Sequence, residues 1–223
     1  MTDIALRKEF LELLKSDRPG RALAVFIKKR PTALAFMEMA DKIPAGPVDF
    51  HAGSVLAHLA RCMNESAGDP LAVWMALCHD AGKLTTPAEI LPHHYDHETR
   101  GNAVIENWTE TLSLPSEYRL SGVMAATLHM KAGVFPRLRP GKKVALLETV
   151  SDSPWPTQFW RLINADTKSR LGDALRWLQE INDRAREADV LLDYRILMIK
   201  KISSLIFAPR PDALLYGKKS ASD

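Results

Sequence analysis

Apolar residues recur every three to four positions along most of this chain. Leu6, Phe10, Leu13 and Leu14 share one helical face early in the chain. Two-residue alternation is almost absent, and no Asn-Gly or Asp-Gly hairpin signal occurs. The pattern therefore predicts an all-α bundle. The expected helices cover about 4–15, 21–30, 31–43, 51–63, 70–80, 94–111, 115–131, 140–152 and 157–166, followed by a long stretch over 170–207 that forms one helix or a bent pair.

Proline, glycine and capping residues mark the ends of these helices. The cluster Ile43-Pro44-Ala45-Gly46-Pro47 is the clearest internal boundary. Asp69-Pro70 reads as an N-cap followed by a first helical residue, and Gly82 as a left-handed residue that ends this helix. Thr86-Pro87-Ala88-Glu89 has the form of a capping box that opens a short helix.

Net charge, cysteine spacing and the absence of a long apolar run restrict the possible substrates, disulfides and location of the protein. The 223 residues carry a net charge of +3, which permits an anionic substrate but does not indicate nucleic-acid binding by itself. Cys62 and Cys78 have neither zinc-motif nor disulfide spacing, so we expect buried free thiols in a reducing compartment. Without a signal pattern or a membrane-spanning apolar run, we expect a cytoplasmic protein with no membrane partner.

The candidate chemistry lies in the seven histidines, which all fall between positions 51 and 129. The adjacent pair His79-Asp80 can present one nitrogen and one oxygen to the same divalent ion. His51 opens one expected helix and His79-Asp80 closes the next, so antiparallel packing would bring them together. Two imidazoles and one carboxylate leave coordination positions open for catalysis. The sequence therefore favours a metal-dependent hydrolase of phosphate esters.

The string Ala76-Leu77-Cys78-His79-Asp80-Ala81-Gly82-Lys83, continued to His94, resembles a known family. It is similar to the HD superfamily of metal-dependent phosphohydrolases, and within it to the C-terminal HD domain of bacterial CCA-adding tRNA nucleotidyltransferases. His97-Glu98 with Arg100-Gly101, and Asn164-Ala165-Asp166 through Arg170-Leu171-Gly172, extend the resemblance over roughly 15–175. It implies an HD domain over 47–170. The helical pattern and the Pro/Gly boundaries add an expected N-terminal helical segment over 1–46, a helical extension over 171–208 and a disordered tail over 209–223.

No Gly-Ser loop or paired aspartates on a strand match the nucleotidyltransferase head of that family. CCA addition is therefore not implied. The resemblance implies instead hydrolysis of 2′,3′-cyclic nucleotides, 2′-nucleotides or nucleotide phosphomonoesters, with tRNA or RNA ends as further partners.

The positions of the residues, together with the resemblance, suggest the members of the site. The expected metal ligands are His51, His79, Asp80 and a distal carboxylate, for which Asp152 is preferred and Asp166 is the alternative. Mg²⁺, Mn²⁺, Ni²⁺ and Co²⁺ all suit mixed nitrogen and oxygen ligands. We expect catalytic roles for Asp80, Lys83 and His97, and substrate contacts from Lys83, His94, His97, Arg100 and His129. His58 reads as structural, two turns past His51.

A non-catalytic RNA- or nucleotide-binding module on the same scaffold is the competing interpretation. It is motivated by Ser151, which stands where the family has its distal aspartate, one position before Asp152. A one-residue shift turns a helical side chain by about 100°. An Asp152 that points away from His79-Asp80 would favour this interpretation. The oligomeric state stays open.

Overall fold

The computed structural model describes residues 3–47 and 53–208, and every regular element within them is a helix, which confirms the predicted all-α class. The α-helices are α1 (Asp3–Lys15), α2 (Pro19–Lys29), α3 (Val55–Glu65), α4 (Pro70–Cys78), α5 (His97–Thr111), α6 (Ser116–Gly133), α7 (Pro140–Ser151), α8 (Pro156–Thr167), α9 (Leu171–Glu187) and α10 (Leu192–Ile206). Short 3₁₀ helices are η1 (Met37–Met39), η2 (Ala81–Thr85), η3 (Ala88–Ile90) and η4 (Phe135–Arg137).

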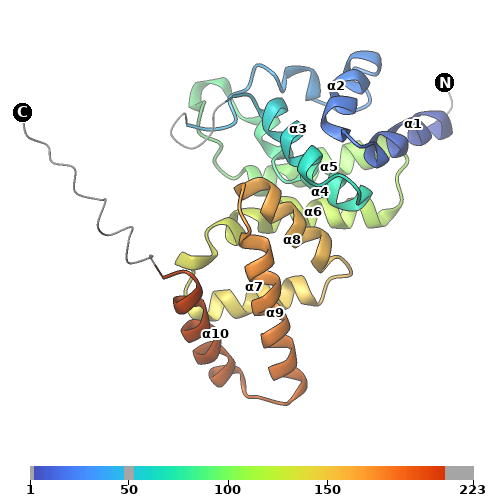
Figure 1. Cartoon of the computed structure of the whole chain (residues 1–223). Coiled ribbons are helices and arrows are strands. Elements are labelled where there is room, and N and C mark those ends of the chain that lie inside the picture. The colour runs from blue at the N-terminus through green and yellow to red at the C-terminus, as the bar shows by residue number, and fades with distance from the viewer. Residues whose placement is uncertain (1–2, 48–52, 209–223) are drawn as a thin grey trace, which may run out of the picture.

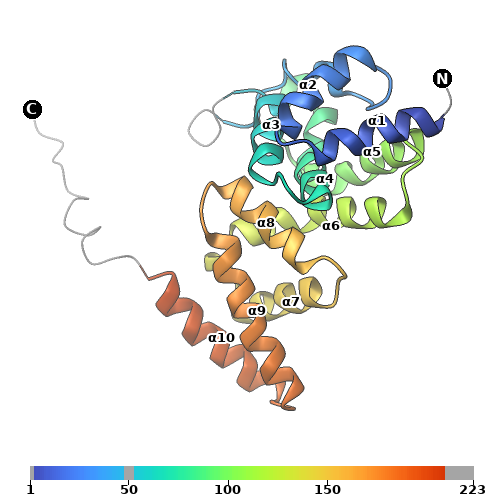
Figure 2. The same ribbon diagram turned by 45° about the vertical axis from the view of Figure 1, so that its right-hand side comes forward.

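The helices form two stacked groups in Figure 1, with α1 to α6 above and α7, α9 and α10 below. Helix α8 packs against both α4 and α9 and so joins the two groups. Figure 2 shows α10 beside α9, where it also contacts α7. The candidate site lies in the upper group, around the end of α4.

Helix α4 is the centre of the upper group. Its residues from Ala72 to Cys78 are all buried, because α1, α3, α6 and α8 surround it. Asp69 caps its start as predicted, since the Asp69 carboxylate accepts hydrogen bonds from the Leu71 and Ala72 N–H groups at 3.1 Å. None of the described helices is both long and apolar enough to cross a bilayer.

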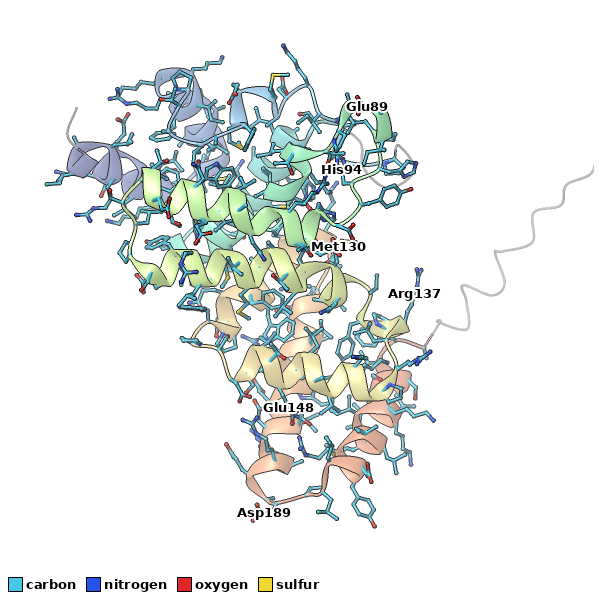
Figure 3. All side chains as sticks on the ribbon, turned by 180° about the vertical axis from the view of Figure 1, so that it is seen from behind. Glu89, His94, Met130, Arg137, Glu148 and Asp189 are labelled. Atoms are coloured by element: carbon cyan, nitrogen blue, oxygen red, sulfur yellow. The ribbon has the colours of Figure 1, made fainter. Side chains whose placement is uncertain are left out.

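A buried arginine attaches the last helix to the lower group. The Arg195 guanidinium of α10 contacts the Glu148 carboxylate of α7 and donates to the Asn182 side-chain oxygen of α9 at 3.2 Å. Figure 3 labels Glu148 on α7 and Asp189 in the turn between α9 and α10. The φ of 55° at Asp189 breaks the stretch expected over 170–207 into two helices, the bent pair of the two expected forms.

Two other local expectations are wrong. The helix expected over 31–43 is a series of turns with only η1, and Phe36 has a left-handed φ of 69° immediately before it. The expected capping box does not form, because the Thr86 hydroxyl bonds to the His94 ring and the Arg100 guanidinium instead. Its short helix is reduced to η3.

Gly82 is required for close packing, and it does not end a helix in the left-handed conformation as expected. It lies inside η2, against the start of α5. A Cβ atom at Gly82 would lie 1.9 Å from the His97 carbonyl oxygen and 2.6 Å from the Gly101 nitrogen. The missing side chain therefore allows η2 and α5 to touch, which brings His97 toward Asp80.

We predict that Gly82→Ala lowers the free energy of unfolding by about 2 kcal/mol or more, because backbone on the other side of the contact cannot move away cheaply. Gly133→Ala is the matched control, since a Cβ there meets nothing within 4 Å, and a small gain of up to about 1 kcal/mol is expected. Urea unfolding measures both. Equal effects of the two substitutions would contradict this account of Gly82.

Candidate metal centre

Asp80 lies directly after the buried end of α4, in the turn that leads into η2. The His79 N–H donates to the Met75 carbonyl at 3.0 Å, and Asp80 then leaves the α-helical conformation. In a 3₁₀ turn the side chains of residues i and i+3 point in the same direction, so the Lys83 side chain lies next to that of Asp80. The Lys83 Nζ atom lies 2.8 Å from Asp80 Oδ2 and donates to the Ala45 carbonyl, also at 2.8 Å.

One oxygen of the Asp80 carboxylate faces a first group of donor atoms. The Nε2 atoms of His58 and His79 lie 3.2 and 3.3 Å from Asp80 Oδ2. Asp166 Oδ1 of α8 is 3.3 Å from His58 Nε2 and 3.5 Å from His79 Nε2. Cys62 is the fourth member, and one ligand atom each from His58, Cys62, His79 and Asp166 lie within 4.8 Å of one another.

The other oxygen of Asp80 faces a second group. The Nε2 atoms of His97, the first residue of α5, and of His129 on α6 lie 3.2 and 3.4 Å from Asp80 Oδ1. These two nitrogens are 3.2 Å apart. One carboxylate is therefore shared between two sets of imidazoles that come from different helices.

Backbone carbonyls determine which nitrogen of three rings carries a proton. The Nδ1 atoms of His79, His97 and His129 lie 2.7 to 2.8 Å from the carbonyl oxygen three residues earlier. Because a carbonyl only accepts, Nδ1 must donate, and in the neutral rings Nε2 presents its lone pair to the cluster. Asp80 Oδ1 is buried with no hydrogen-bond partner among the described residues. Converging lone pairs of nitrogen and oxygen fit a divalent cation.

His58 differs from the other three rings. Its Nδ1 atom lies 3.3 Å from Arg61 Nη2, which can only donate, so Nδ1 accepts there and the neutral ring carries its proton on Nε2. The Arg61 guanidinium also contacts the Glu65 side chain and the Ala165 carbonyl. A cation at His58 Nε2 therefore requires the proton to move to Nδ1 and the long Arg61 contact to loosen.

Burial and mutual charge shift the pKa values of the cluster strongly. Burial opposes a charged His79 ring, but Asp80 and Asp166 outweigh it and raise the pKa of His79 to about 10. Burial also opposes ionised carboxylates, yet Lys83 and His79 hold the pKa of Asp80 well below its usual range. His79 and His58 do the same for the pKa of Asp166. In the metal-free protein, the proton on His79 and the neighbouring Lys83 oppose the negative charge of the carboxylates.

His94 and Arg100, expected to contact substrate, lie in a hydrogen-bond chain beside the cluster. Arg100 Nη2 donates to the Thr86 hydroxyl at 3.0 Å, and the hydroxyl is 2.8 Å from His94 Nδ1. The His94 Nε2–H donates to the Pro44 carbonyl at 2.8 Å. Figure 3 labels His94 in the loop that leads into α5. This series of hydrogen bonds connects the segment after η2 to the backbone at Pro44. Contacts of His94 and Arg100 with a phosphate group stay a prediction.

The structure brings part of the predicted site together, and the prediction for His51 stays a prediction. His79, Asp80, Lys83, His97 and His129 come together, whereas His51 lies outside the described residues.

Asp152 does not reach the cluster. It caps the end of α7, its carboxylate bonds to Arg186 Nη2 at 2.8 Å, and its side chain is 60% exposed. The buried face of α7 passes through Leu147 and Val150 instead. The preference for Asp152 over Asp166 is therefore corrected, because α8, and not α7, brings its carboxylate to His58 and His79.

His58 and Cys62 are the members of the cluster that the sequence analysis did not assign to it. They lie one turn apart on α3 and are both buried. The sequence does indicate His58, because its polar imidazole ring lies on the apolar helix face that includes Val55, Leu59 and Cys62. The expectation that Cys62 and Cys78 are buried free thiols is confirmed.

Comparison with known proteins places this site in context. No family model matches the chain, and no solved structure matches it. Curated relatives do match. The chain is similar to proteins named "Multifunctional CCA protein". The relative from Chromobacterium violaceum is 31% identical over 178 residues, covering 74% of this chain and 42% of the relative. That from Aromatoleum aromaticum is 35% identical over 169 residues, covering 71% and 40%.

A relative of the same name from Legionella pneumophila is 34% identical over 105 residues, which is 47% of this chain and 26% of the relative. The chain thus spans between about a quarter and two fifths of the length of these relatives. The resemblance stated from the residues is supported at the level of a region related to CCA proteins.

The pKa shifts predict a pH window of stability for the metal-free protein. The raised pKa of His79 contributes stability that is full below about pH 6.5 and is lost as the pH rises toward 10. The depressed pKa values of Asp80 and Asp166 contribute stability that is full above about pH 4 and is lost as the pH falls further.

Urea unfolding in EDTA should therefore show an alkaline decline on the order of a few kcal/mol at most between pH 6.5 and 10. His79→Gln should flatten this decline. His93→Gln should not, because the exposed His93 ring stacks on Tyr95 outside the cluster. A decline of unchanged steepness in His79→Gln would show that His79 is not its source.

Proposed function

We propose that this chain is an HD-type, divalent-metal-dependent phosphohydrolase that acts on 2′,3′-cyclic nucleotides or nucleotide phosphomonoesters. The observation that carries the proposal is the buried Asp80 carboxylate, whose two oxygens each face a pair of imidazole nitrogens. His58, His79, Asp80 and Asp166 would hold one ion. His97, His129 and the same Asp80 carboxylate could hold a second.

A divalent ion bound there would supply an activated water and polarise a phosphoryl oxygen. The residues of the chain supply the rest. Lys83 holds the shared carboxylate in position through its 2.8 Å contact with Asp80 Oδ2. As a buried cation beside the site, Lys83 also favours a phosphate anion. His97 and His129 would stabilise developing charge or protonate the leaving oxygen when they do not hold an ion.

The substrate class rests on the similarity to CCA proteins and on the donor set. Mixed imidazole and carboxylate ligands suit phosphate-ester hydrolysis by Mg²⁺, Mn²⁺, Ni²⁺ or Co²⁺. The net charge of +3 is compatible with nucleotides and with RNA ends as substrates.

A binding module on the same scaffold is the second candidate. Asp152 does point away toward Arg186, which was the feature expected to favour it. Asp166 lies 3.3 Å from His58 Nε2 and 3.5 Å from His79 Nε2, and would supply a carboxylate in place of Asp152. We therefore prefer the hydrolase.

Turnover of 2′,3′-cyclic AMP tests the hydrolase and the distal ligand together. The EDTA-treated protein is refilled in turn with Mg²⁺, Mn²⁺, Ni²⁺ and Co²⁺. We expect metal-dependent turnover that Asp166→Asn and His79→Ala lower by about 100-fold or more, because each removes a ligand. Asp152→Asn is the matched control and should stay within about twofold of wild type, since its ion pair is exposed.

Three outcomes are distinguishable. Metal binding without turnover of cyclic nucleotides or phosphomonoesters would transfer the assignment to the binding module. Loss of activity in Asp152→Asn but not in Asp166→Asn would reverse the choice of distal ligand. Full activity in His79→Ala would reject the proposed centre.

The metal content tests whether Asp80 bridges two ions. We expect two Mn²⁺ or Co²⁺ per chain at saturation, and one in His97→Gln, because the second group would lose one of its three ligands. Equilibrium dialysis with elemental analysis measures the stoichiometry. Two ions retained in His97→Gln, or a single ion in the wild type, would contradict a second centre.

A further inference from the structure

Cys62 belongs to the hydrophobic core, and its sulfur also borders the group formed by His58, His79 and Asp166. It lies one helical turn after His58 on α3, and it is completely buried. Its Sγ atom is 3.7 Å from His58 Nε2. Together with His79 Nε2 and a carboxylate oxygen of Asp166, these atoms all lie within 4.8 Å of one another. The sulfur therefore faces the same space as three of the proposed metal ligands.

The other cysteine of the chain provides a comparison. Cys78 is equally buried, but its sulfur lies on the side of α4 that packs against α6, 3.0 Å from where a Cβ on Gly122 would be. Cys78 thus behaves as a small apolar residue in the helix interface. The sulfur of Cys62, in contrast, lies within 4.8 Å of imidazole nitrogens of His58 and His79 and of a carboxylate oxygen of Asp166. Sulfur is a weak hydrogen-bond partner for such groups, whereas it is a strong ligand for many divalent ions.

We infer that Cys62 is a thiolate ligand of the metal held by His58, His79, Asp80 and Asp166, and that it selects Co²⁺, Ni²⁺ or Zn²⁺ over Mg²⁺. This inference rests on the proposed metal centre. Burial and the nearby Asp166 carboxylate raise the pKa of the Cys62 thiol in the metal-free protein. The thiol would therefore release its proton to solvent only as its sulfur bonds to the ion, with no change in oxidation state. Thiolate and imidazole favour these ions, whereas Mg²⁺ requires oxygen ligands.

The choice among metals is what this ligand would decide. His, Asp and water ligands alone are compatible with Mg²⁺ and Mn²⁺ as well as with Co²⁺ and Ni²⁺. A sulfur ligand raises the affinity of the site for the thiophilic ions and leaves the affinity for the oxygen-preferring ions nearly unchanged. The same sulfur would be protected from oxidation while the ion is bound, because its lone pair would be engaged.

Optical spectroscopy of the Co²⁺-loaded protein tests the ligand directly, without relying on activity. Wild type and Cys78→Ser should both show the visible bands of protein-bound Co²⁺ and a near-ultraviolet sulfur-to-cobalt charge-transfer band. Cys62→Ser should keep the visible bands and lose the charge-transfer band. In parallel, its affinity for Co²⁺ should fall by about tenfold or more, while its affinity for Mn²⁺ changes by less than roughly threefold.

The wild-type spectrum decides the question even if Cys62→Ser does not fold. Visible bands without a charge-transfer band in the wild type would overturn the role of Cys62 and leave the metal centre intact. No bound Co²⁺ by equilibrium dialysis would overturn the metal centre itself, and the cysteine ligand with it. A charge-transfer band that is lost in Cys78→Ser but kept in Cys62→Ser would also overturn the inference.

Discussion

The buried Asp80 carboxylate is the constraint on which the rest of the structure depends. An ionised carboxylate away from water is unfavourable unless opposite charges or hydrogen-bond donors surround it. Lys83 meets this requirement at 2.8 Å, and the protonated His79 ring adds to it. The remaining imidazoles around Asp80 come from other helices, so α3, α5 and α6 must converge on the end of α4. Helix α8 adds the Asp166 carboxylate beside His58 and His79.

Formation of the cluster and formation of the fold are therefore closely coupled. Gly82 allows η2 to touch α5, which sets the distance from Asp80 to His97. The burial of α4 on all sides fixes the position of its C-terminal end. Helix α8 packs against α4, and this packing places Asp166 beside His79. A cation that replaces the protons on these rings would bind only the folded chain and would stabilise it. In the absence of a cation, His79 and Lys83 oppose the negative charge of Asp80.

The segments around the cluster are held by polar contacts to backbone carbonyls. Lys83 donates to the Ala45 carbonyl and His94 donates to the Pro44 carbonyl. Two side chains therefore hold the backbone of residues 44 and 45 in place. Arg100 extends this chain through Thr86. The cationic and imidazole groups that make these contacts therefore hold the backbone on one side of the cluster. The cluster itself combines nitrogen, oxygen and sulfur donors, and the sulfur has the largest consequence for the choice of metal.

Local sequence determined the helical class, the Asp69-Pro70 start of α4 and the His79-Asp80 pair at its end, because apolar spacing and capping act over a few residues. The family-like string and the following His97-Glu98 element also pointed to Lys83 and His97, whereas His129 stood out as a polar residue on an apolar helix. Tertiary structure alone decided that His58 joins the cluster and that Asp166, and not Asp152, completes it. Both choices depend on how α3, α7 and α8 are rotated against α4. Each residue turns the side-chain direction of a helix by about 100°, so the spacing of residues along the sequence does not determine which side chain faces α4.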